Sequence, residues 1–131
     1  MKPNVALTIA SGFSVLLFTF HLADDIVRGY EKGVLWNLTA IPIAVLWLCG
    51  AALVLGERRS GYAIVLLLSL LAIGVPIIHF KNPAGFAGSR VANTDGAFFF
   101  VWTLLASGVT SLFSVILAAR GLWGLRARRA G

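Results

Sequence analysis

Residues 34–55 read VLWNLTAIPIAVLWLCGAALVL and contain no charged side chain. A helix of about 20 apolar residues is long enough to cross the hydrocarbon core of a membrane. Three further segments have a similar length and composition, at about 5–23, 61–80 and 97–119. Their apolar residues form continuous runs and lack the period-two alternation of membrane β-strands. The sequence therefore predicts an all-α membrane protein, a single domain of residues 1–131 with four transmembrane helices in an antiparallel bundle.

The composition agrees with a chain that lies in lipid. Of the 131 residues, 59% are hydrophobic and 12% are charged, whereas soluble domains carry about 25% charged residues. A soluble domain of this size exposes too much of its surface to water to hide so much apolar material. A disordered chain has the opposite composition. Both of these classes are therefore excluded.

Basic residues are divided unequally between the two predicted sides of the membrane. The side with both termini holds seven of them, Lys2, Arg58, Arg59, Arg120, Arg126, Arg128 and Arg129, and the other side holds four, Arg28, Lys32, Lys81 and Arg90. Because Lys and Arg are enriched in cytoplasmic segments, we expect cytoplasmic termini and a location in the cytoplasmic (inner) membrane of a bacterium. The same distribution explains the net charge of +6 without a nucleic-acid partner.

The fourth span carries small and hydroxyl-bearing side chains at spacings of three and four: Thr103, Ser107, Ser111, Ser114 and Ala118. This spacing places them on one helix face. Small residues hold helices together in lipid because they let the backbones approach closely. We predict that this face packs against another helix or a second copy of the chain. The expected partners are membrane lipid and a homo-oligomer or larger membrane complex.

Aromatic and basic residues near the ends of the spans are predicted to lie at the lipid headgroups. Trp36 and Trp102 stand near the outer boundary, and Trp123 stands near the inner one. Indole side chains favour this region of a membrane. The tail adds Arg126, Arg128 and Arg129, and resembles a contact with anionic lipid.

Proline and glycine mark irregular points in this pattern. Pro42 and Pro76 fall inside the second and third spans, where each removes a backbone donor and predicts a kink. The longest connection, residues 81–96, contains Pro83 and three glycines. Its composition suits either a flap over the outer end of the bundle or an ordinary loop.

The two histidines lie at the same predicted end of the bundle. His21 closes the first span and His79 closes the third. Asp24 and Asp25 follow His21 at spacings of three and four, so both carboxylates can turn toward its face of the helix. Asn37 enters the second span at a similar depth. We expect His21, Asp25, His79 and Asn37 to converge inside the bundle as a ligand or metal site. Asp24 is a further candidate ligand, but spacing four favours Asp25, and Asp24 would then turn toward Arg28 or support the site from outside the ligand set.

Three interpretations of this polar group remain open. Two imidazoles and a carboxylate can ligate a transition metal such as zinc or copper, and also manganese or iron. The same residues can accept protons or bind an organic ligand. They can also simply mark the membrane interface, with Asp24 paired to Arg28 in water. The single cysteine, Cys49, excludes a cysteine metal cluster.

The chemistry available elsewhere is limited. The chain has no Gly-x-Ser-x-Gly elbow, no phosphate-binding loop and no charged residue at mid-membrane depth. The leading prediction is a small multi-pass inner-membrane protein that acts by binding or association, as an accessory or oligomeric subunit, with a ligand or metal site at its extracytoplasmic end. One alternative is a small transporter or channel, which would use the hydroxyls of the fourth span and Ser69. The other is a metal-dependent membrane enzyme.

Overall fold

A computed structural model of the protein describes residues 1–29, 31–81 and 95–130, with the side chains of residues 80, 81, 129 and 130 outside the description. The long helices are α1 (Pro3–Val27), α2 (Ala40–Leu55), α3 (Arg59–Lys81) and α5 (Ala97–Ala130), and a short 3-10 helix, η1 (Leu35–Thr39), leads into α2. The described residues contain no β-strand. The prediction of an all-α fold is therefore confirmed. Most of the connection predicted as a flap or loop lies outside the described residues.

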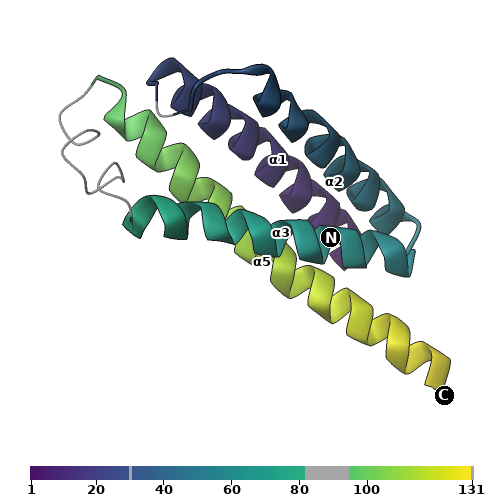
Figure 1. Ribbon diagram of the computed structural model, residues 1–131. Helices are drawn as coiled ribbons and strands as arrows, with labels where there is room; N and C mark the ends of the chain where they lie inside the picture. The colour runs from purple at the N-terminus through teal and green to yellow at the C-terminus, as the bar shows by residue number, and fades with distance from the viewer. Residues whose placement is uncertain (30, 82–94, 131) are drawn as a thin grey trace.

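All four predicted spans are present as helices that are long and apolar enough to cross a membrane. Successive helices run in opposite directions, and both termini lie at the same end of the bundle (Figure 1). We call this the terminal end. Large apolar side chains are exposed on the outside of every long helix, among them Phe13, Leu46, Leu71 and Val109. This apolar exterior is what a bundle surrounded by lipid requires.

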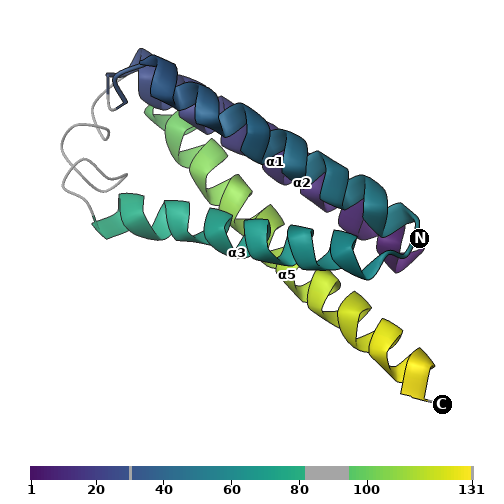
Figure 2. The ribbon, with the colours of Figure 1, turned by 45° about the vertical axis from the view of Figure 1, so that its right-hand side comes forward.

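The helices are arranged in a ring in the order α1, α2, α3, α5. Each helix packs on its two neighbours in this ring, and the views in Figures 1 and 2 agree with this order. The diagonal helices α1 and α3 touch only slightly. Glycines permit the close contacts: a Cβ atom on Gly61 would lie 2.7 Å from Val54 N on α2, and one on Gly108 would lie 2.9 Å from Pro76 Cγ on α3.

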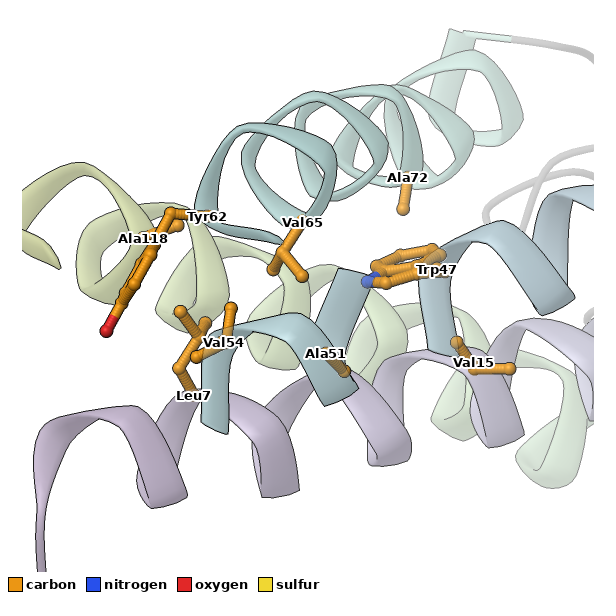
Figure 3. Packing of buried hydrophobic residues seen from close by; sticks show 9 residues of the cluster. All are labelled: Leu7, Val15, Trp47, Ala51, Val54, Tyr62, Val65, Ala72 and Ala118. Carbon is orange, nitrogen blue, oxygen red and sulfur yellow. The ribbon is translucent and has the colours of Figure 1, made fainter. Parts of the chain in front are cut away.

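The apolar core lies toward the terminal end. Leu7, Val54, Val65 and Ala118 come from the four long helices, and each is 0% exposed. Figure 3 shows these side chains facing one another between the helices, with the Trp47 ring to their right, near Ala72. A layer of this kind excludes water because it leaves no polar group to bind it.

The small-residue face of α5 lies within the bundle. Thr103, Ser107, Ser111, Ser114 and Ala118 are all buried, and the large apolar side chains on the other faces of α5 are exposed: Phe98, Leu105, Leu112 and Phe113. This face is therefore occupied by contacts within one chain. It offers no argument for a second copy.

Helix α5 is longer than the predicted span. The prediction ended it near residue 119, but the helix continues to Ala130. A helix of 34 residues is about 51 Å long, which exceeds the hydrocarbon thickness of about 30 Å. Figures 1 and 2 show its C-terminal part extending past the other helices. The segment contains no proline, and its Leu and Arg residues favour helix.

Pro42 also differs from its prediction. It is the third residue of α2, within the first turn, where backbone N–H groups have no intrahelical acceptor. The proline therefore removes no helical hydrogen bond there. The 3-10 helix η1 precedes it directly.

Candidate metal centre

His21, Asp25 and His79 form a cluster at the end of the bundle opposite the termini. One ligand atom from each residue lies within 4.8 Å of the other two. His21 is 2% exposed and Asp25 is 6% exposed, while the side chain of His79 is 24% exposed. The two α1 residues are one turn apart, and His79 reaches them from the last turns of α3.

The distances within the cluster are close to those of a metal site. Asp25 Oδ2 lies 3.5 Å from His79 Nε2 and 3.7 Å from His21 Nε2. Ligand atoms on one tetrahedral zinc ion lie about 3.3 Å apart, given zinc–ligand bonds of about 2.0–2.1 Å. All three ligand atoms lie within 4.8 Å of one another, so closing around one zinc ion requires side-chain movements of up to about 1.5 Å.

The other ring nitrogen of each histidine faces a protein acceptor. His79 Nδ1 lies 3.0 Å from the carbonyl oxygen of Val75, and His21 Nδ1 lies 3.5 Å from Thr103 Oγ1. The Thr103 hydroxyl donates its own proton to the backbone carbonyls of Phe99 or Phe100, so its oxygen is free to accept from His21. The Val75 carbonyl oxygen can only accept, so His79 Nδ1 carries a proton, whereas the roles of His21 Nδ1 and the Thr103 hydroxyl depend on the tautomer of the imidazole. In the neutral tautomer protonated at Nδ1, the Nε2 lone pair of each ring faces Asp25.

Two polar atoms of the cluster are buried without a hydrogen-bond partner among the described residues. They are His21 Nε2 and Asp25 Oδ1. Buried polar atoms are usually satisfied by protein or ordered water, and an exception calls for an explanation. A cation between the rings and the carboxylate would satisfy both atoms.

Phe100 forms a wall of the cluster. It is 0% exposed, and its ring centroid lies 4.9 Å from that of His21 and 5.9 Å from that of His79. The two imidazole centroids lie 4.9 Å apart, nearly edge to face. Helix α5 thereby restricts the movement of both rings and shields His21 from bulk water.

The neighbouring carboxylates Asp24 and Asp25 face different surroundings. Asp24 Oδ2 accepts a hydrogen bond of 2.8 Å from Arg28 Nε, one turn later on α1. Arg28 Nη2 also donates to the carbonyl oxygen of Asp95 just before α5. A Cβ atom on Gly96 would lie 2.6 Å from this nitrogen, so the glycine makes room for the arginine. Asp24 therefore holds the ends of α1 and α5 together, outside the His21–Asp25–His79 cluster.

Asn37 lies in η1 with its Oδ1 atom buried and without a hydrogen-bond partner among the described residues. The hydrogen bonds and ion pairs of the cluster do not include it in the part of the chain that the structure describes. Its predicted convergence with His21, Asp25 and His79 remains a prediction.

The predicted interface residues lie on the surface. Trp36, Trp102 and Trp123 are 76%, 58% and 80% exposed, and Arg126 and Arg128 are exposed on α5. The side chain of Arg129 lies outside the described residues.

Sequence reasoning missed two contributors to the cluster. It assigned Thr103 only to helix packing, although this hydroxyl also contacts His21 Nδ1. It also did not select Phe100. Their spacing of three along α5 was a usable signal, because it places both on one side of the helix.

The fold and the cluster together define a class, a small integral membrane protein with four candidate spans and a buried His/Asp group at one end. The chain matches no protein family, no curated protein and no solved structure. The functional argument therefore rests on the geometry of the cluster.

Proposed function

We propose that this small membrane protein binds a transition-metal ion, with zinc as the best match, through His21 Nε2, His79 Nε2 and the Asp25 carboxylate. The observation that carries the proposal is the convergence of three acceptors in a buried place. Two imidazole lone pairs and a carboxylate face one another at 3.5 and 3.7 Å, and a cation is the species that three acceptors attract.

A metal ion fits this arrangement better than a single proton does. Protonated Nε2 atoms could also donate to Asp25, but the Nε2–Oδ2 distances of 3.5 and 3.7 Å are long for hydrogen bonds, and His21 Nε2 has no hydrogen-bond partner among the described residues. Two nitrogen atoms and one oxygen atom suit tetrahedral zinc, while copper(II) favours tetragonal sites. The Nδ1 contacts with Val75 and Thr103 are the kind that orient metal-ligating histidines.

Binding is favoured over transport by the apolar layer at the terminal end. Buried hydroxyl groups continue past the Ser14–Thr110 hydrogen bond to Ser11 and Ser114, which lie one turn from Leu7 and Ala118. Beyond them Leu7, Val54, Val65 and Ala118 are each 0% exposed. A permeating ion would need polar partners through this layer. The proposed location is the extracytoplasmic end of a bacterial inner membrane, from the distribution of basic residues.

Three protein ligands leave one coordination position of a tetrahedral zinc ion for water or another group, as in catalytic zinc sites. A metal-dependent enzyme therefore remains the second candidate. It requires the same metal site, so metal binding is the first property to test.

The test is metal retention by the full chain purified in detergent, stripped with chelator and reloaded with zinc. Elemental analysis after gel filtration is expected to give about one zinc ion per chain, and cobalt substitution an absorption spectrum typical of tetrahedral coordination. His21→Ala, His79→Ala and Asp25→Asn are each expected to abolish retention.

Glu31→Gln is the matched control, because it removes a carboxylate at the same end outside the three-residue cluster. It is expected to retain zinc like the wild type. A wild-type protein that retains no zinc, or a His79→Ala variant that retains as much as the wild type, would overturn the proposal. Proton or organic-ligand binding, and a position at the membrane interface without a ligand, would then be the remaining interpretations of the cluster.

A further inference from the structure

A second feature lies at the terminal end, far from the His21–Asp25–His79 cluster along the helices. It is a cavity of about 510 Å³ between the start of α1 and the part of α5 that extends past the bundle. Lys2, Arg120 and Arg128 line it, together with the apolar side chains of Leu117 and Leu125. It therefore combines a cationic rim with apolar walls.

Two glycines of α5 shape this cavity in different ways. A Cβ atom on Gly121 would collide with the Tyr62 ring, so the tyrosine packs directly on the helix backbone there. A Cβ atom on Gly124, one turn later, would meet nothing within 4 Å. Gly124 lines the cavity, so a side chain at this position would enter open space.

The charge of the cavity is positive. Arg128 Nη1 lies 3.2 Å from Glu57 Oε2 in an exposed ion pair, and this carboxylate belongs to the same lining. Within the described residues, Lys2 and Arg120 have no acidic partner within ion-pair distance. An anion that enters the cavity therefore meets two cations that no acidic side chain neutralises.

We propose that this cavity binds the headgroup of an anionic phospholipid. Its position is the first reason: α5 leaves the bundle here, at the ends of the candidate spans, where lipid phosphates lie. Its composition is the second, because a phosphodiester pairs with Lys and Arg while the start of the acyl chains can lie against Leu117 and Leu125. Basic pockets between transmembrane helices bind anionic headgroups in this way.

The test is native mass spectrometry of the full chain in detergent, with equal amounts of phosphatidylglycerol and phosphatidylcholine that carry the same acyl chains. The wild type is expected to bind phosphatidylglycerol preferentially. Each of Lys2→Gln and Arg120→Gln is expected to lower this preference about fivefold, and the double variant about 25-fold. Inorganic phosphate should compete poorly, because it lacks the acyl chains.

The matched control is the double variant Arg58→Gln/Arg59→Gln. It removes the same charge at the same end, and both residues are exposed and lie outside the lining of this cavity. If both double variants lose the preference equally, diffuse surface charge attracts the lipid and the proposal fails. Competition by free phosphate as strong as that by lipid would also overturn it.

Gly124→Leu tests the space independently of charge. Leucine favours helix over glycine and meets no neighbour here, so stability is expected to hold or rise while the lipid preference is lost. Unchanged lipid preference in this variant would contradict the proposal. Zinc retention is expected to be unchanged in all of these variants. The proposal of lipid binding can therefore be refuted without affecting the proposal of zinc binding, and the reverse also holds.

Discussion

His79 Nε2 on α3 lies 3.5 Å from Asp25 Oδ2 on α1. The two helices are diagonal in the bundle and touch only slightly elsewhere, so this contact crosses the interior. A metal ion bound there would join two helices that do not otherwise pack closely. Binding at the cluster is therefore expected to affect the stability of the whole bundle.

Zinc is expected to stabilise the wild-type protein against thermal unfolding in detergent. A ligand present at one hundred times its Kd adds about 2.7 kcal/mol to the free energy of unfolding. The melting temperature of His79→Ala should not respond to zinc, while that of Glu31→Gln should rise as in the wild type. An equal rise in His79→Ala would place the bound metal elsewhere.

Thr103→Val is expected to weaken zinc binding about 10- to 100-fold, with the stoichiometry and the helical content retained. Valine has nearly the same shape but offers no oxygen to His21 Nδ1, which lies 3.5 Å from the threonine hydroxyl. Competition with a chelator of known affinity measures the change. Thr103→Ser keeps the hydroxyl and should restore most of the affinity. Equal weakening by serine and valine would show that Thr103 acts only through packing.

Ser111→Leu is expected to lower the melting temperature, because Ser111 is 0% exposed and an added bulky side chain in a packed interior costs about 1–3 kcal/mol. Phe98→Leu is the control on the same helix, since Phe98 is 81% exposed. Circular dichroism during heating compares the two variants. If Ser111→Leu has the same melting temperature as the wild type, the small-residue face of α5 is not tightly packed.

The orientation in the membrane can be tested with single cysteines in a Cys49→Ala background. Ala127→Cys is expected to react with an impermeant maleimide only from the cytoplasmic side, and Lys32→Cys only from the opposite side. Both positions are exposed. Reaction of Lys32→Cys from the cytoplasm would reverse the orientation predicted from the basic residues and place the cluster at the cytoplasmic end.

The sequence by itself determined the properties that arise within one helix. The four spans could be predicted because crossing lipid requires an uninterrupted apolar run, and such a run is visible without any knowledge of neighbours. Spacing along one helix also favoured Asp25 over Asp24 as the partner of His21. Asp24 pairs with Arg28 four residues later, and Asp25 lies one turn after His21.

Only the tertiary structure decided which residues from different helices meet. It set the order of the helices around the ring. It also brought Thr103 and Phe100 of α5 next to His21 of α1. These residues are far apart in the chain, and no local sequence pattern determines the distance between them. Lipid solvates every apolar helix face equally well, so the hydropathy of a helix does not predict which helices it packs against. Helix pairing is determined by close approach at small residues and by buried hydrogen bonds. Both depend on the surfaces of two helices together.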